Sequence, residues 1–214
     1  MSEPLFNGAR RVPDRKQADI MADRRRRRTE LIEQLRRGER VENGINVNIK
    51  RLHPDAVIPQ YATDLAAGFD LVAVEDVIIA PGETAKVPLG LAFEIPPGYV
   101  MLVCTRSGIA LKTKLRQPNG IGVIDSDYRG EVAMMFDNTR PALSIDEYCE
   151  WPTFLNGEEA VGVNLLGGEY IVRKGDKVAQ AFVIPYPRVN FVEAAELTET
   201  TRGVGGFGHT GVSV

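Results

Sequence analysis

The segment LAFEIPPGYVMLVC, residues 91–104, holds two apolar runs separated by the turn-forming triplet Pro96-Pro97-Gly98. Short runs bounded by proline and glycine are typical of β-strands joined by a tight turn. Similar runs span residues 45–49, 77–79, 131–136 and 177–184. Turn-forming residues punctuate the chain at Pro81-Gly82, Pro118-Asn119-Gly120, Lys174-Gly175-Asp176 and Pro185. The chain after residue 44 is therefore predicted to be all-β, an antiparallel sandwich or barrel.

The composition excludes several classes of protein. The chain has 214 residues, of which 43% are hydrophobic and 26% are charged, as in globular proteins. No run approaches the ~18 apolar residues of a membrane span, and no secretory signal pattern is present. Cys104 and Cys149 stand far apart without a disulfide pattern, which fits a reducing compartment. We therefore expect a cytoplasmic protein that does not bind membranes.

Residues 1–44 differ in charge from the remainder of the chain. They carry 12 Lys and Arg against 8 Asp and Glu, whereas residues 45–214 carry 14 against 21. Asp14 to Gly38 lacks proline and internal glycine, which predicts a helix. Arginines 24–28 point in every direction around such a helix, so it cannot bury one face in a core. We expect a basic helical arm over 1–44 and a separate β domain over 45–214.

Three segments could carry chemistry. Arg106-Ser107-Gly108 follows a predicted strand and fits either a phosphate-binding segment or a plain turn. The carboxylates of Asp125 and Asp127 follow a short apolar strand, where one could act as a general base for water or simply form a turn. The glycine-rich residues 202–211 could close over an anion or form a flexible tail.

Other readings of the sequence fail. Residues 203–208 match the letters of a dinucleotide-binding fingerprint, but they lie six residues from the C-terminus, where no helix can follow. His53 and His209 have no metal-ligand spacing with each other or with the cysteines. The His-x-Glu and Pro-Cys-x-x-Cys motifs are also absent, so a zinc deaminase is excluded. His209 in a flexible tail is a poor partner for a serine triad.

Five segments in order resemble the five motifs of the trimeric dUTPases: residues 67–73, 106–110, 122–131, 175–180 and 202–211, with Lys177 where arginine is usual. The resemblance implies a jelly-roll-like distorted β-barrel, to which this chain adds an N-terminal helical extension. It implies a homotrimer with active sites at subunit interfaces. It also implies hydrolysis of dUTP to dUMP and pyrophosphate, with Mg²⁺ held by substrate phosphates and water rather than by protein ligands.

The resemblance assigns roles in the third motif and the hairpin before it. Asp125 would be the general base that activates water for attack on the α-phosphorus. Tyr128 would pack under the deoxyribose and reject UTP. Asn119, in a tight hairpin with Gly122, would read the uracil edge and exclude cytosine and thymine.

The remaining motifs would hold phosphates and close the site. Arg106, Ser107, Gly108 and Gln180 would bind phosphates, and Asp70 would support the hydrogen-bond network. A C-terminal arm, residues 198–214, would close over the nucleotide. Its substrate-binding residues would be Arg202, Phe207, Gly208, His209 and Thr210, with Phe207 on uracil and Arg202 and Thr210 at the γ-phosphate. His209 stands where many relatives have serine, so its own role stays open.

Such an enzyme would limit uracil in DNA and supply dUMP for thymidylate synthesis. One alternative is dCTP deaminase or a bifunctional relative, which shares the fold and trimer. Another is a regulatory protein that binds nucleic acid or a partner through the Arg-rich arm or through an insertion at residues 139–168. That insertion contains Trp151, which either faces a partner or pins the loop onto its own domain. Insertions at this place occur in some phage-encoded members, so a phage origin and a host cytoplasm fit the sequence.

Overall fold

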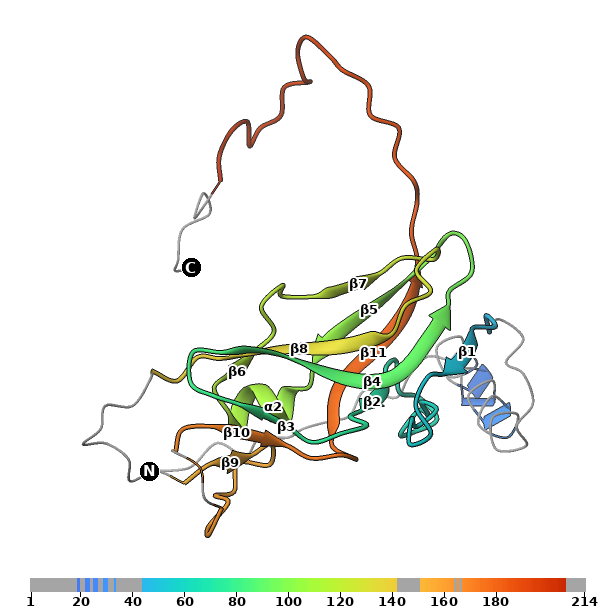
Figure 1. Ribbon diagram of the computed structural model, residues 1–214. Coiled ribbons are helices and arrows are strands. Elements are labelled where there is room, and N and C mark those ends of the chain that lie inside the picture. Colours follow the sequence, from blue (N-terminus) through green and yellow to red (C-terminus); the bar gives the residue numbers. More distant parts are fainter. Residues whose placement is uncertain are drawn as a thin grey trace, which may run out of the picture.

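The computed structural model describes residues 44–141, 151–163, 165 and 167–206 (Figure 1). It also describes eight residues of the arm: Asp19, Ala22, Asp23, Arg25, Arg26, Thr29, Glu30 and Glu33. All eight are helical. Arg26 forms ion pairs along this helix, at 3.0 Å from Asp23 and 3.9 Å from Glu30. In the described part of the chain, no helix has the length and apolarity that a membrane crossing requires.

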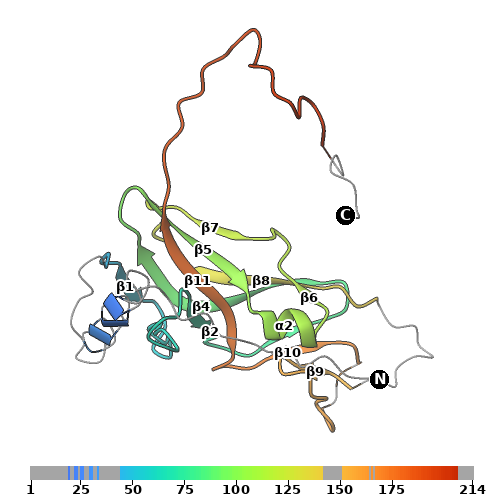
Figure 2. The ribbon, with the colours of Figure 1, turned by 180° about the vertical axis from the view of Figure 1, so that it is seen from behind.

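From residue 44 onward, the described chain forms three β-sheets and a short helix (Figures 1 and 2). The first sheet has the order β1 (Asn48–Arg51), β4 (Thr84–Glu94), β8 (Val132–Asn138), β6 (Leu115–Arg116). The second has the order β2 (Phe69–Val72), β11 (Lys177–Pro185), β5 (Tyr99–Thr105), β7 (Gly122–Ile124). The third has the order β3 (Val77–Ile79), β10 (Tyr170–Val172), β9 (Thr153–Phe154). Helix α2 (Ser107–Lys112) follows β5.

The sheets share one apolar core, which follows from alternation along the strands. In β8, Val132, Met134 and Phe136 are buried, and the residues between them are more exposed. Such alternation places one face of a strand in the core and the other toward the surface. Asn138 is also buried, but its side-chain amide donates to the carbonyls of Ile79 and Gly168, both at 3.0 Å. The buried Asn138 amide at the C-terminal end of β8 therefore has hydrogen-bond partners, and it links the first sheet to the third.

A β-bulge in β4 connects the core to the turn that follows β7. The register of β4 against β8 shifts between Pro88 and Leu91, and Gly90 has a φ of 64°. The Gly90 N–H donates to the Glu131 carboxylate at 2.8 Å. The start of β8 is thereby tied to the bulge by a charge-assisted hydrogen bond.

The all-β prediction is confirmed, with three differences in detail. The described strands form three sheets and do not close into a barrel. The segment at Arg106-Ser107-Gly108 is not a plain turn, because Arg106 is the N-cap of helix α2. Strand β4 is also longer than its apolar run of residues 91–95 predicts, since Pro88 and Gly90 interrupt the pattern where the bulge lies.

The described part of the insertion packs on the β domain. Thr153 and Phe154 form β9, which pairs with β10 in parallel. Leu155 belongs to the core cluster, and the Arg173 guanidinium carbon lies 3.4 Å from the centroid of the Phe154 ring. Trp151 is 42% exposed at the surface. These contacts pin the second half of the insertion to its own domain.

The C-terminal segment leaves the sheets. After β11, residues 186–206 form no strand or helix, and Figures 1 and 2 show them running away from the β domain. Phe191 and Leu197 on this segment are 94% and 89% exposed. The described part of this segment therefore leaves large apolar side chains uncovered.

Candidate active site

Three predicted motifs meet at one end of the second sheet. Asp70 on β2 forms two ion pairs. Its Oδ1 lies 3.0 Å from Arg106 Nε, and its Oδ2 lies 2.7 Å from Lys177 Nζ. The Asp70 side chain is only 19% exposed, so these pairs are less screened than ordinary surface ion pairs. The structure therefore brings together the acid of the first motif and cations of the second and fourth.

The register of the sheet explains this convergence. Gln180 on the central strand β11 lies opposite Asp70 on one side and opposite Cys104 on the other. Its side-chain amide donates to the Thr105 carbonyl at 3.4 Å. Arg106 follows Thr105 directly, and its guanidinium also donates from NH1 to the Lys177 carbonyl at 3.3 Å. Asp70, Arg106 and Gln180 thus share one sheet end.

Helix α2 begins at this cluster. Arg106 is its N-cap, and Ser107 and Gly108 form its exposed first turn. The first N–H groups of a helix have no intrahelical partner, so they are available to an acceptor. The second motif therefore offers a guanidinium, a hydroxyl and backbone donors on one side.

The hairpin that carries Asn119 is fastened to β5 by Gln117. The Gln117 side chain accepts from the Thr105 N–H at 3.1 Å and donates to the Val103 carbonyl at 3.1 Å. Gly122 lies opposite Val103, and a Cβ at Gly122 would approach the Val103 Cβ to 3.2 Å. Asn119 itself is exposed in the turn. Gln117 was not among the predicted site residues, because its role depends on strand pairing that no local motif reports.

The turn after β7 places Asp125 and Tyr128 together. The Tyr128 N–H donates to the Asp125 carbonyl at 3.2 Å, and the Tyr128 hydroxyl donates to the Glu131 carbonyl at 3.0 Å. Both side chains are exposed. A Cβ at Gly130 would lie 2.4 Å from the Tyr128 oxygen, so the ring can occupy this place only beside glycine. Gly130 is a second residue that the sequence did not single out.

Asp125 does not lie near Arg106 in the same chain. Ile124 pairs with Met101, which places Asp125 beside Val100, six residues before Arg106. Antiparallel strands rise by about 3.4 Å per residue, so the two residues are about 20 Å apart. At this separation, the two side chains do not meet within a single chain.

The C-terminal motif is only partly described. Arg202 is exposed, and its Nε donates to the Gly205 carbonyl at 2.7 Å within the segment that leaves the sheets. Phe207, Gly208, His209 and Thr210 lie outside the described residues. The described contacts of Arg202 are therefore local ones.

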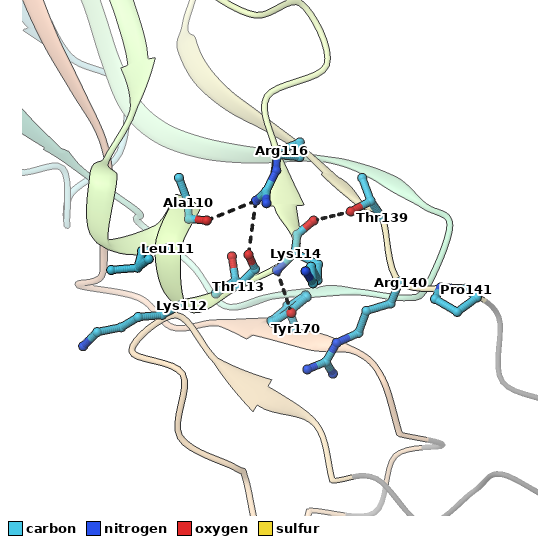
Figure 3. Close-up of a pocket in the computed structure, with 10 residues that line it drawn as sticks. All are labelled: Ala110, Leu111, Lys112, Thr113, Lys114, Arg116, Thr139, Arg140, Pro141 and Tyr170. Carbon is cyan, nitrogen blue, oxygen red and sulfur yellow. Dashed lines mark hydrogen bonds between the residues drawn. The ribbon is translucent and has the colours of Figure 1, made fainter.

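A separate cavity of about 400 Å³ contains none of the predicted site residues (Figure 3). Four cations line it, Lys112, Lys114, Arg116 and Arg140. Figure 3 shows the Arg116 guanidinium directed at the carbonyls of Ala110 and Thr113, at 3.3 and 3.1 Å. The Arg140 guanidinium lies 4.5 Å from the centroid of the Tyr170 ring. Both arginines are thus engaged by the fold around them.

The chain is similar to known nucleotidohydrolases over most of its length. The family model described as dUTPase matches residues 55–148. The deoxyuridine 5′-triphosphate nucleotidohydrolase of Nautilia profundicola is 39% identical over 167 residues, which are 78% of this chain and 99% of that protein. The enzyme of the same name from Helicobacter pylori strain 26695 is 36% identical over 169 residues, 79% of this chain and 99% of that protein.

Solved structures of similar fold include two phage proteins. A mutant dUTPase of Staphylococcus bacteriophage 80alpha, with dUpNHpp, has a TM-score of 0.71 at 27% identity and covers 78% of this chain and 99% of its own. A mutant dUTPase from phage phi11 of S. aureus, described with a structural Mg(II) ion, has a TM-score of 0.65 at 28% identity and covers 71% and 98%. The relatives found by sequence and those found by structure thus carry names of the same enzyme.

Proposed function

The chain belongs to the dUTPase family, and we propose that it is a dUTP diphosphatase, which hydrolyses dUTP to dUMP and pyrophosphate. One observation carries the proposal: the 39% identity to the N. profundicola nucleotidohydrolase extends over 99% of that protein. The cluster of Asp70, Arg106 and Gln180 supports it, because these residues come from three separate motifs of the resemblance. The enzyme would limit uracil in DNA and supply dUMP for thymidylate synthesis.

We assign the hydrolytic step to Asp125. Its carboxylate would accept a proton from a water molecule as the water oxygen bonds to the α-phosphorus and pyrophosphate departs. The exposure of Asp125 and the hydrogen bond from the Tyr128 N–H to its carbonyl support this role, because they keep the carboxylate accessible on an ordered turn. A positioned general base contributes about 10²–10⁴ in rate.

Phosphate binding is assigned to the end of the sheet where α2 begins. Arg106 would pair with phosphate oxygens, Ser107 and Gly108 would donate from the first turn of α2, and Gln180 would support the α-phosphate. Arg106 and Lys177 beside a single carboxylate leave this cluster with a net positive charge, which favours a polyanion.

Selectivity for deoxyuridine is assigned to the hairpin and turn around β7. Asn119 and Gly122 would face the uracil edge, and Tyr128 would pack under the deoxyribose. The Tyr128 ring is held at its hydroxyl by the Glu131 carbonyl and lies over Gly130, so it has little room to yield to a 2′-hydroxyl. A site that pairs polar base edges discriminates well, because a wrong base leaves buried groups unpaired.

The site requires more than one copy of the chain. The distance of about 20 Å between Asp125 and Arg106 along β5 means that one subunit supplies only part of it. We propose a homotrimer in which the turn of Asp125 and the phosphate-binding end of the sheet come from different subunits. The C-terminal segment with Arg202, Phe207, Gly208, His209 and Thr210 would close over the nucleotide of a neighbouring subunit.

Mg²⁺ enters the proposal as a companion of the substrate. Within the described ranges, no group of three His, Cys, Asp or Glu residues could hold a metal ion. Mg²⁺ prefers phosphate oxygens and water to an all-protein cage. The triphosphate of the substrate would therefore supply the oxygen ligands of the ion. When bound, it would offset the charge of the phosphate groups during hydrolysis.

A pyrophosphate assay tests the proposal. Purified protein with Mg²⁺ should release pyrophosphate from dUTP, and it should release almost none from dTTP, dCTP or UTP. Release from dUTP no faster than from dTTP would contradict the assignment. Ammonia released from dCTP at rates like those for dUTP would favour the deaminase alternative instead.

A further inference from the structure

We propose that Lys177 is a positioning residue, which holds Asp70 so that the Arg106 guanidinium presents its remaining N–H groups to substrate phosphates. The inference rests on the proposed role of Arg106 as a phosphate ligand. It assigns to Lys177 an effect on substrate binding that is exerted through two other side chains. Lys177 itself need not touch the substrate.

A β-bulge puts Lys177 on the correct face of the sheet. Gln180 pairs with Asp70 and Ala179 pairs with Leu71, but Lys177 pairs with Val72, so the register shifts by one residue. In an unbroken strand, residues 177 and 180 would face opposite sides. The inserted residue is Val178, which is fully buried together with Ala179. The bulge therefore returns Lys177 to the face that carries Asp70 and Gln180.

Asp70 then connects the two cations. Lys177 Nζ binds Oδ2 at 2.7 Å, and Arg106 Nε binds Oδ1 at 3.0 Å. A carboxylate held at both oxygens cannot rotate, so its hold on Arg106 has a fixed direction. Because the Asp70 side chain is 19% exposed, water competes weakly for its oxygens.

Arg106 is held on two of its nitrogens and free on the third. Nε is bound to Asp70, and NH1 donates to the Lys177 carbonyl at 3.3 Å. Among the described residues, no contact of NH2 is present, and the side chain is 36% exposed. The planar guanidinium thus points its NH2 edge outward in one orientation, which is the pre-organised form of a phosphate ligand. Lys177 contributes to this orientation both through Asp70 and through its own carbonyl.

The experiment compares Lys177→Met with Lys174→Met. Lys174 lies on the turn just before β11, and its Nζ forms an ion pair of 2.6 Å with Asp55. Its exposure of 53% matches the 51% of Lys177. Both variants lose one positive charge and one ion pair, but only Lys177→Met releases Asp70 and Arg106.

We expect Lys177→Met to weaken binding of a non-hydrolysable dUTP analogue and to lower kcat/KM by about 10-fold, because misplaced ligands of the reacting group are costly. Lys174→Met should keep the wild-type affinity for the analogue and the wild-type kcat/KM.

Two further variants separate positioning from charge or folding. Lys177→Arg keeps the charge and the reach to Asp70, so it should retain most of the binding. In an Arg106→Lys background, which lacks the guanidinium to be oriented, Lys177→Met should cause less than about 2-fold further loss. Equal binding by Lys177→Met and Lys174→Met, or a full additional loss in the Arg106→Lys background, would overturn the inference. An inactive wild type would instead overturn the proposed function, so the two failures are distinguishable.

Discussion

Asp125 and Arg106 illustrate how the proposed chemistry divides among single residues. Asp125 is exposed on a turn, and among the described residues its hydrogen bond is made through its backbone carbonyl, which suits a group that must meet water and release a proton. Arg106 is instead bound on two sides, by Asp70 and by the Lys177 carbonyl, which suits a group that must keep one direction. A base and an anion ligand thus have opposite requirements for side-chain freedom.

Replacement of Asp125 tests the base directly. Asp125→Asn keeps the size and the backbone hydrogen bond but removes the proton acceptor, so kcat should fall by about 10²–10⁴. Affinity for a non-hydrolysable dUTP analogue should change little, as measured by calorimetry. A variant with wild-type kcat would remove Asp125 from the mechanism.

Gly130→Ala tests the packing of Tyr128. The new methyl group would lie 2.4 Å from the Tyr128 oxygen and 2.6 Å from Cζ, so the ring must move. We expect the preference for dUTP over UTP, measured as a ratio of kcat/KM, to fall by about 10-fold. Gly82→Ala, where a methyl group meets nothing within 4 Å, controls for the added methyl group and, despite its φ of 78°, should keep the ratio. An unchanged ratio in Gly130→Ala would contradict the role of Tyr128.

At the scale of elements, the apolar runs predicted strands well and the irregular features poorly. Residues 77–79 and 99–104 coincide with β3 and with most of β5, because alternation and flanking turns are local signals. The bulges at Gly90 and Val178 were not predicted, since they depend on the partner strand. The motif order located Asp70, Arg106 and Gln180, and the structure brings these together. Gln117 and the contacts of Lys177 were not predicted, because they depend on strand pairing. Gly130 was not predicted, because the approach of the Tyr128 ring depends on the conformation of the turn.

Gly90→Ala tests the bulge in β4. A Cβ there would approach the Cβ of His53 to 2.7 Å and Val74 Cγ1 to 2.9 Å, and the φ of 64° is unfavourable for alanine. Overpacking and backbone strain together should lower the free energy of unfolding by about 2–4 kcal/mol. Gly82→Ala, with a similar φ of 78° and open space, should cost only about 1 kcal/mol. Equal losses in urea unfolding of the two variants at one protein concentration would contradict the packing argument.

The ion pair of Asp55 and Lys174 makes part of the stability depend on pH. The hydrogen bond from Lys174 lowers the pKa of Asp55 below its ordinary value of 3.8, against an opposing effect of desolvation, and the charges of Lys174 and His53 lower it further. A lowered pKa in the folded state adds stability above pH 3.8 that is lost as the pH falls through the folded pKa. Lys174→Met should therefore have a slightly lower Tm than the wild type at neutral pH, and the difference should vanish in acid. A difference that grows in acid would contradict this account.

At the scale of the whole molecule, we propose that a single chain forms only part of the active site. The proposed base Asp125 and the proposed phosphate ligand Arg106 lie about 20 Å apart along β5, and the C-terminal segment carries exposed apolar side chains away from the sheets. Both features would be accommodated by the proposed homotrimer, in which further copies of the chain complete the site and cover the segment. The helical arm and the first half of the insertion lie largely outside the described residues, so a nucleic-acid or protein partner for them stays a prediction from the sequence.

Subunit complementation tests the shared site most directly. Asp125→Asn and Arg106→Ala chains, each inactive alone, would be mixed in equal amounts, unfolded and refolded together, and assayed for pyrophosphate release from dUTP. If the two residues of one site come from different chains, about a quarter of the sites in random mixed trimers contain both native residues, and activity should return to about that fraction. A mixture as inactive as its two components would contradict a site shared between subunits.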